Sequence, residues 1–255
     1  MKENIMDLTG KIAVVTGSTK GLGKQMAIDL AKAGAHVVIV SRSQEDCNVV
    51  ADEIKKDYEV DTLAAAADLT IQSDIDNLVD KTLERFSRVD ILVNNAGSSI
   101  TKKAEELTET DWDRIIDLDL KSVFFSAQAF GKIMIKQNKG KIINISSILG
   151  LVGEKQVLPY CVAKGGVLQM TKALGLEWAR YNINVNAVSP GYVKTKMNEL
   201  ELETEAIKKN LLGKTPMKRY GTVEEISGAV VFLASEASNY MTGQVIVVDG
   251  GWTAQ

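Results

Sequence analysis

The sequence has little of what secreted and membrane-spanning proteins contain. Cys47 and Cys161 are the only residues available for a disulfide, which favours a reduced, cytoplasmic setting. No apolar run approaches the roughly 20 residues that span a bilayer. The first ten residues lack the apolar core of a signal peptide. We therefore expect neither a disulfide scaffold nor a membrane partner.

The chain also has no large excess of charge of either sign, and it contains little histidine. The net charge is −3, whereas nucleic acid binding needs a strong basic surplus, so we expect no nucleic acid partner. His36 is the only histidine and opens an apolar segment, where a structural role is expected. No group of histidine, cysteine and carboxylate residues has the spacing of zinc ligands, so we expect no metal.

The chain also lacks internal repeats and Pro/Ser-rich linkers. Its 255 residues, 45% hydrophobic and 25% charged, have an ordinary globular composition. A chain of this length buries a core without help from a metal or disulfide. We predict a single dinucleotide-binding and catalytic domain over residues 1–255.

Short apolar runs rich in β-branched residues alternate with segments of helical period. The predicted strands are Lys11–Thr16, His36–Val40, Asp61–Ala67, Asp90–Val93, Lys141–Ile145, Asn184–Ala187 and Gln244–Val248. The predicted helices are Gly23–Ala33, Gln44–Asp57, Ile71–Phe86, Asp111–Gln137, Tyr160–Tyr181 and Glu224–Ser235. Uninterrupted apolar strands that alternate with helices indicate a parallel sheet covered on both faces. The fold class is therefore α/β, one doubly wound (Rossmann) sheet of about seven strands, with ligands bound beyond their carboxyl ends.

A glycine-rich segment, Thr16–Gly23 (TGSTKGLG), separates the first predicted strand from the first helix. Glycines let the backbone turn tightly and let a pyrophosphate approach the free N–H groups of a helix start. The spacing G-x-x-x-G-x-G is not the common G-x-G-x-x-G pattern, so an ordinary turn stays an alternative. In its context we predict that the segment binds dinucleotide phosphates.

The end of the second strand indicates which dinucleotide is bound. NAD-binding proteins usually have an acidic residue there, but this chain has Ser41 and Arg42. A guanidinium suits the 2′-phosphate of NADP, and Lys20 adds a second positive charge. Arg42 could instead be a solvated surface charge, and Asp46 could serve the ribose. We predict NADP(H) in preference to NAD(H).

Tyr160 and Lys164 are four residues apart at the start of a predicted helix and so share a face. An isolated tyrosine is a poor proton shuttle at neutral pH, but an ammonium about 4 Å away stabilises a phenolate by roughly 4 kcal/mol. Alone, this spacing is most often incidental. Ser147, just past a predicted strand, adds a hydroxyl that can bond a substrate carbonyl. The three residues predict acid/base catalysis.

The chain resembles the classical short-chain dehydrogenase/reductase family along essentially its whole length. The motifs that carry the resemblance are TGSTKGLG at Thr16–Gly23, Asp68, NNAG at Asn94–Gly97, Ser147 with Tyr160 and Lys164, Pro190-Gly191 with Thr195, and VDGG at Val248–Gly251. Together and in this order they are highly specific. The resemblance implies hydride transfer between the nicotinamide and a carbonyl or secondary alcohol, with the proton exchanged by Tyr160.

The resemblance also implies how the cofactor is held. Asp68 would meet the adenine, Asn95 to Gly97 would flank the ribose, Lys164 would hold the nicotinamide ribose, and Pro190 to Thr195 would cover the nicotinamide. The complete set of predicted cofactor contacts is Gly17, Ser18, Thr19, Lys20, Gly21, Leu22, Gly23, Ser41, Arg42, Asp68, Leu69, Asn95, Ala96, Gly97, Tyr160, Lys164, Pro190, Gly191, Val193 and Thr195.

One position departs from the family pattern. The family usually has an asparagine in the long fourth helix, whose backbone carbonyl holds a water that links the catalytic lysine to solvent. Alignment from Trp112 places Asp119 there. The change is tolerated if the carbonyl does this work, but the carboxylate could also stabilise the charge of Lys164 or compete for it. The predicted catalytic residues are thus Ser147, Tyr160, Lys164 and Asp119.

Substrate recognition is expected from Ser98–Ile100, from Leu149–Leu158 and from a charged lid at about 194–214. The 3-oxoacyl-carrier-protein reductases resemble the chain broadly. Lys132 falls where those enzymes tend to be basic for docking an acidic carrier, but a second such position holds Leu176.

The gluconate 5-dehydrogenase-like sugar reductases are the other resemblance within the family. They resemble the chain in IDLDL, in GKIINI and in the stretch from ARYNINVN through GKTPMKRYG to FLASEASNY. Glu154 stands where they tend to have arginine, and its carboxylate would disfavour an acidic sugar. We predict a small sugar, polyol or ketone as the substrate.

Two further expectations concern the class of protein and its assembly. A catalytically weak NADP-binding sensor or scaffold is the alternative of another class, which Asp119 would permit and the intact Ser147, Tyr160 and Lys164 disfavour. The helices Asp111–Gln137 and Tyr160–Tyr181 resemble the subunit interface of the family, which implies a homotetramer.

Overall fold

The computed structural model describes residues 4–195 and 199–254. Within these residues, seven strands form one sheet in the order β3-β2-β1-β4-β5-β6-β7, and all neighbours are parallel. The strands are β1 (Ile12–Thr16), β2 (His36–Ser41), β3 (Thr62–Ala66), β4 (Ile91–Asn94), β5 (Gly140–Ile145), β6 (Ile183–Pro190) and β7 (Val245–Val248). The predicted doubly wound sheet is confirmed, and its strand order reverses between β1 and β4, where such folds bind ligands.

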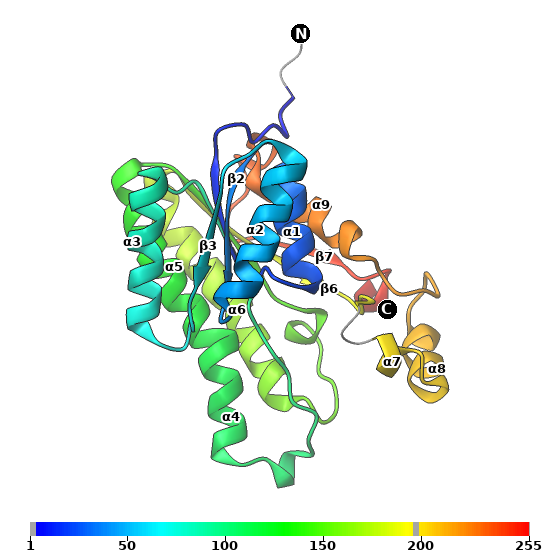
Figure 1. Ribbon diagram of the computed structural model, residues 1–255. Coiled ribbons are helices and arrows are strands. Elements are labelled where there is room, and N and C mark those ends of the chain that lie inside the picture. Colours follow the sequence, from blue (N-terminus) through cyan, green and yellow to red (C-terminus); the bar gives the residue numbers. More distant parts are fainter. Residues whose placement is uncertain (1–3, 196–198, 255) are drawn as a thin grey trace.

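Helices cover both faces of this sheet (Figure 1). One face carries α1 (Gly21–Lys32), α2 (Gln44–Tyr58) and α9 (Val223–Ala234), and the other α3 (Gln72–Phe86), α5 (Ser122–Gln137) and α6 (Leu158–Trp178). Along β2, Val37 and Ile39 pack in the first core while Val38 and Val40 pack in the second, because successive strand side chains alternate. No helix in the described residues is long and apolar enough to cross a membrane.

The predicted helix Asp111–Gln137 is two helices joined by a wider turn. α4 (Glu109–Ile116) begins with a capping box between Thr108 and Asp111. A π-helical turn, Asp117–Lys121, then leads into α5. Such turns carry one extra residue and occur frequently at functional sites. The position singled out from the sequence, Asp119, lies in this turn.

Two other boundaries differ by three residues from those predicted. α6 ends at Trp178, three residues before the predicted end, and a 3-10 turn over Ala179–Tyr181 follows. β6 continues past its predicted end to Pro190, which pairs with Val248 of β7. Proline has no N–H group to donate, and the N–H of Gly191 directly after it donates to the carbonyl of Val248 at 2.9 Å.

The predicted lid at about 194–214 is partly helical. Residues 196–198 lie outside the described chain, and the remainder contains α7 (Glu199–Leu202) and α8 (Glu205–Lys214), neither of which the sequence pattern predicted. Ion pairs connect this segment: Lys194 lies 2.9 Å from Glu203, which lies 2.8 Å from Lys208. Its role as a lid stays a prediction.

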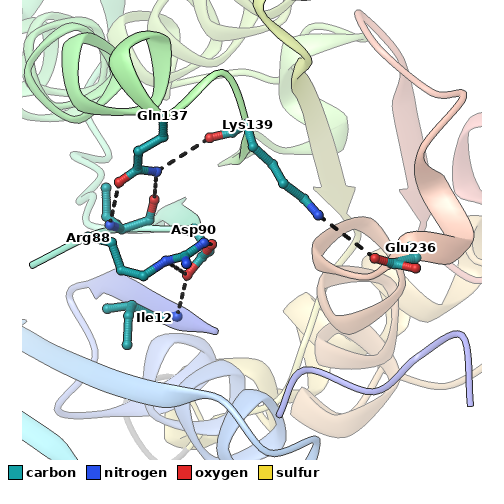
Figure 2. Close-up of polar contacts among 7 residues, drawn as sticks. Ile12, Arg88, Asp90, Gln137, Lys139 and Glu236 are labelled. Atoms are coloured by element: carbon teal, nitrogen blue, oxygen red, sulfur yellow. Dashed lines mark hydrogen bonds and ion pairs between the residues drawn. The ribbon is translucent and has the colours of Figure 1, made fainter. Parts of the chain in front are cut away.

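The amino ends of the strands are joined by a polar network (Figure 2). Asp90 accepts a hydrogen bond from the backbone N–H of Ile12 at 3.0 Å and from Arg88 Nε at 3.0 Å. Gln137, the last residue of α5, bonds both backbone groups of Val89. These contacts tie β1, β4 and α5 together at the end of the sheet opposite the glycine-rich loop.

Candidate active site

The glycine-rich loop links β1 to α1 and closes tightly on itself. Gly17 and Gly21 have φ values of 64° and 55°, which favour glycine. A Cβ on Gly23 would lie 2.2 Å from the carbonyl oxygen of Gly17, so only glycine fits there. No side chain caps α1, whose first N–H groups therefore face the loop in the way that anion-binding helix starts do.

The loop after β4 holds the glycine-rich loop in place. Asn95 Nδ2 donates to the carbonyl oxygens of Thr16 at 2.9 Å and Gly17 at 3.2 Å. The backbone N–H groups of Asn95 and Ala96 both donate to Thr16 Oγ1, at 2.9 and 3.0 Å. The side chain of Asn95 thus positions the glycine-rich loop.

Ser18 has its side chain turned into the protein. It is fully buried, and its hydroxyl donates to the carbonyl of Val15 and accepts from the N–H of Val40. Its own N–H donates to the carbonyl of Val40 at 3.0 Å. Ser18 therefore joins β1 to β2. Because its hydroxyl and its N–H are both bonded within the protein, it would help to bind the cofactor by keeping the loop in shape.

Lys20 and Arg42 are both exposed, and both follow the carboxyl ends of adjacent strands. Asp68, beyond β3, has its pKa lowered by hydrogen bonds from Thr70 and, more weakly, by the Arg42 guanidinium. Leu69 beside it is buried. Ser41 Oγ accepts from the N–H of Ser43, which shapes the turn that presents Arg42. This end of the site thus contains the basic side chains of Lys20 and Arg42 and the carboxylate of Asp68, which lies just beyond β3.

Ser147, Tyr160 and Lys164 come together where β5 ends and α6 begins. Lys164 Nζ donates to the carbonyl of Ile145, the last residue of β5, at 3.1 Å, and lies 5.5 Å from the Tyr160 ring centre. In return, Ser146 Oγ donates to the Lys164 carbonyl at 2.9 Å. Ser147 follows directly and accepts from the N–H of Leu149. The structure thus brings the three predicted catalytic residues to one place.

Asp119 reaches Lys164 with its side chain. Its Oδ2 lies 3.2 Å from Lys164 Nζ, and its Oδ1 accepts from the N–H of Ser98 at 2.8 Å. Asp119 is fully buried, and burial raises its pKa more than the Lys164 charge lowers it. A Cβ on Gly97 would lie 2.6 Å from Asp119 Oδ2, so glycine is needed above the pair. Of the roles considered for Asp119 from the sequence, the structure shows the one in which its carboxylate acts directly on the Lys164 ammonium.

The segment after β6 crosses toward the glycine-rich loop. A Cβ on Gly191 would lie 2.7 Å from the Cα of Asp249, and Val193 forms a bridge with Gly221. Thr195 Cγ2 lies 3.8 Å from the position of a Cβ on Gly21. Of the predicted residues that follow Pro190, Thr195 therefore borders the glycine-rich loop.

Two aromatic residues lie at this site: Tyr192, which falls in the predicted range Pro190–Thr195 but was not singled out, and Trp252, which was not found from the sequence. The rings of Tyr192 and Trp252 lie 5.0 Å apart, and Lys214 Nζ lies 5.5 Å from the Trp252 ring and 4.0 Å from Glu154 Oε2. Burial, helped by Glu154, Cys161 and Tyr160, raises the pKa of Tyr192 to about 12. The aromatic residue directly after Pro190-Gly191 and the tryptophan after VDGG were the available signals.

The described residues contain no cluster of three or more histidine, cysteine or acidic side chains that could hold a metal ion. They do contain what a dinucleotide needs: a glycine loop at an uncapped helix start, basic groups beside it, and a tyrosine and lysine at the far end. A parallel α/β sheet with this arrangement at its carboxyl end defines a Rossmann-type oxidoreductase.

Comparison with known proteins identifies the family. The family model described as Enoyl-(Acyl carrier protein) reductase matches residues 17–253. The 2-dehydro-3-deoxy-D-gluconate 5-dehydrogenase of Escherichia coli is 42% identical over 97% of both chains. The 3-oxoacyl-[acyl-carrier-protein] reductase of Synechocystis is 40% identical over 96% of this chain and 97% of that protein. This chain belongs to the short-chain dehydrogenase/reductase family and is an oxidoreductase of that type.

Among solved structures, a gluconate 5-dehydrogenase from Burkholderia cenocepacia, in complex with NADP and tartrate, superimposes with a TM-score of 0.94. It is 36% identical, and the alignment covers 98% of each chain. The likeness extends over the whole sheet and its helices, as the sequence motifs implied.

Proposed function

We propose that this protein is an NADP(H)-dependent oxidoreductase that interconverts a carbonyl and a secondary alcohol on a small sugar, polyol or ketone. The observation that carries the proposal is the meeting of Ser147, Tyr160 and Lys164 at the end of β5, where Lys164 is anchored on the Ile145 carbonyl at 3.1 Å. The nicotinamide supplies or accepts the hydride at carbon when it is bound.

The residues of this chain manage the proton. In reduction, the Tyr160 hydroxyl gives its proton to the carbonyl oxygen as the hydride reaches carbon, and in oxidation Tyr160 takes that proton. Ser147 orients the same oxygen through its hydroxyl. Lys164 stabilises negative charge on Tyr160, and Asp119, 3.2 Å from Lys164 Nζ, holds the ammonium in position.

NADP(H) is favoured by the charges at the adenosine end. Arg42 and Lys20 would meet the 2′-phosphate, which a carboxylate at the end of β2 would repel. Arg42→Asp should weaken NADPH binding by about tenfold or more, the loss expected for one charge-assisted contact, and should improve NADH binding. The measurement is a fluorescence titration with each cofactor. Equal NADPH affinity in both proteins would remove the argument for NADP.

Neutral substrates are favoured by the pairing of Glu154 with Lys214. The two groups lie 4.0 Å apart, so Lys214 already has a carboxylate partner, and a substrate carboxylate would have to displace it. Glu154→Gln should therefore raise kcat/KM for sugar acids relative to neutral sugars and polyols. Glu154→Asp is the matched control, because it keeps the charge. If Glu154→Gln leaves the ratio of kcat/KM for sugar acids to kcat/KM for neutral substrates unchanged, the charge of Glu154 does not select the substrate.

The decisive test is NADPH oxidation against a panel of carbonyl compounds. The panel contains neutral keto sugars and ketones, keto sugar acids such as the substrate named for the Escherichia coli relative, and a 3-oxoacyl thioester. Wild type should reduce at least one compound, and Tyr160→Phe should be inactive on it. If both proteins bind NADPH and neither reduces any compound, the enzyme proposal fails and the sensor or scaffold reading takes its place.

A second candidate function is reduction of 3-oxoacyl chains on a carrier protein. Lys132 is exposed on α5 and could dock an acidic carrier, and the Synechocystis relative carries that name. The second docking position holds Leu176, which is 82% exposed and uncharged. This candidate is favoured if the thioester is the best substrate of the panel and Lys132→Glu selectively lowers its kcat/KM.

We also propose that the protein is a homotetramer. On α6, Leu158, Val162 and Leu176 are exposed along the helix, as expected for a face that a second subunit covers. Light scattering that gives a monomer mass would contradict this assembly. The cytoplasmic setting inferred from the sequence stays a prediction.

A further inference from the structure

A second cavity lies at the opposite end of the sheet from the candidate active site. It has a volume of about 900 Å³ and is lined by the amino ends of β1, β4, β5 and β6 and by the segment between α9 and β7. Volumes of this order are typical of sites for small molecules. None of the residues assigned to cofactor or catalysis borders it.

Lys141, the second residue of β5, is the unusual member of this lining. Its side chain is buried, with only 8% of the residue exposed. Lys141 Nζ donates to Ser238 Oγ at 3.2 Å and forms no ion pair with any carboxylate in the described residues. Burial and, to a lesser extent, the charge of Lys139 lower the pKa of Lys141 to about 8, and Glu236 opposes this change. The cavity therefore contains an ammonium without a counter-ion.

The carboxylates around the cavity are already engaged, as Figure 2 shows for two of them. Asp90 accepts from Arg88 and from the backbone of Ile12. Glu236 lies 3.9 Å from Lys139 Nζ.

The third carboxylate that lines the cavity, Asp7, accepts from the hydroxyl and the N–H of Thr9 at 2.6 and 3.0 Å. Lys11 also lines the cavity and adds positive charge beside Lys141. Within the described residues, none of these three carboxylates forms an ion pair with Lys141, and Glu236 only weakly opposes the effect of burial on it. A buried charge is tolerated best when a partner of opposite sign reaches it.

We propose that this cavity is an accessory site for a small anion, whose phosphate or carboxylate group provides the missing counter-ion to Lys141. The anion accepts a charge-assisted hydrogen bond from Lys141 Nζ. Leu8, Ile91 and Met241 provide apolar walls that strengthen this contact by excluding water. The site is separate from the proposed reaction, so it does not depend on that reaction being correct.

The test measures anion binding to the cofactor-saturated protein, because the cofactor blocks the phosphate loop at the other end of the sheet. Inorganic phosphate and acetate are titrated separately at constant ionic strength, and the shift in Tm gives an apparent Kd. Lys141→Met should weaken binding by about tenfold or more, whereas Lys141→Arg should retain it. Lys56→Met, which removes an exposed positive charge on α2, is the matched control.

The two ligands distinguish the source of the anionic group. A response to phosphate alone assigns phosphorylated ligands, and a response to acetate assigns carboxylates. Because acetate keeps one charge between pH 7 and 9.5, its binding should weaken over that range as Lys141 loses its proton. Phosphate stabilises proteins in general, but that effect is the same in all variants. If Lys141→Met responds to both anions as wild type does, the proposal is overturned.

Discussion

Two lysines of the described chain are buried, one at each end of β5, and they differ in what compensates their charge. Lys164 Nζ lies 3.2 Å from Asp119 Oδ2 and donates to the carbonyl of Ile145, which ends the strand. Lys141 lies at the start of the strand and has only the Ser238 hydroxyl. The residues are 3% and 8% exposed, so burial alone does not separate them.

The difference shows what a counter-ion does for a buried lysine. Asp119 lies within ion-pair distance of the Lys164 ammonium, whose nitrogen is 5.5 Å from the centre of the Tyr160 ring. Lys141 has no such partner, and burial lowers its pKa to about 8. The lysine at one end of the sheet thus has a carboxylate neighbour, whereas the lysine at the other end carries a charge that a ligand or a change of pH can alter.

The largest expected effect is on catalysis, which should depend on Lys164 and not on Lys141. Lys164→Met should lower kcat/KM by about 10²–10⁴-fold, the range for losing acid/base assistance. Lys141→Met should stay within about twofold of wild type, as expected for a change away from the reacting groups. Initial rates of NADPH oxidation on the best substrate measure both. Comparable losses in the two variants would show that the two ends are not independent.

The same pair of variants should differ in stability. Lys164→Met leaves the buried Asp119 carboxylate unpaired and should lower the free energy of unfolding by about 3–5 kcal/mol at pH 7.5. The loss should shrink toward pH 5, because burial raises the pKa of Asp119 and the folded protein then takes up a proton more readily. Lys141→Met removes a buried charge without leaving one and should be neutral or stabilising.

Urea denaturation at the two pH values measures these differences. Adding Asp119→Asn to Lys164→Met should recover part of the stability, because no unpaired carboxylate then remains. If Lys141→Met loses more free energy of unfolding than Lys164→Met does, the expected order of the two variants is wrong.

Stability at alkaline pH tests Lys141 alone. Its pKa is 10.5 in the unfolded chain and about 8 in the folded protein. Below pH 8 the buried charge costs stability, and between pH 8 and 10.5 the folded protein loses the proton that the unfolded chain keeps. Wild type should therefore gain up to about 3 kcal/mol relative to Lys141→Met as pH rises through this window. A difference that is constant with pH would mean that Lys141 keeps its charge.

The smallest effect concerns Asp119. Asp119→Asn keeps an acceptor for the N–H of Ser98 but removes the charge beside Lys164. We expect activity to change by about tenfold, the lower part of the range for residues that orient a functional group through another. Initial rates of alcohol oxidation and a fluorescence titration with NADPH measure the effect on activity and on cofactor binding separately. Activity within about twofold of wild type would leave Asp119 with a purely structural role.

Much of this architecture follows from local sequence patterns. The strand predicted at His36–Val40 is β2, His36–Ser41, and the helix predicted at Ile71–Phe86 is α3, Gln72–Phe86. Such elements are predictable because periodicity and turn residues act within a few positions. The π-helical turn at Asp117–Lys121 was not, because it depends on how α4 and α5 pack against α6.

For the site, the sequence by itself determined the residue types and their order. Ser147, Tyr160 and Lys164 stand close in the chain, and the glycines of the phosphate loop are required by local backbone geometry. The inward orientation of the Ser18 hydroxyl, by contrast, could not be predicted, because its bond with the N–H of Val40 spans 22 residues. Contacts between distant segments leave no local signal.

Only the tertiary structure decided how the buried charges are compensated. The side chain of Asp119 reaches Lys164 across the interface of the π-helical turn and α6, and Lys141 reaches Ser238 over a separation of 97 residues. The sequence specifies where a lysine stands in the chain, but the packing of distant helices and strands decides which group lies close enough to compensate its charge. Lys141 of β5 and Lys164 of α6 are alike in the sequence, and the fold makes one part of the wall of a cavity and the other part of a candidate active site.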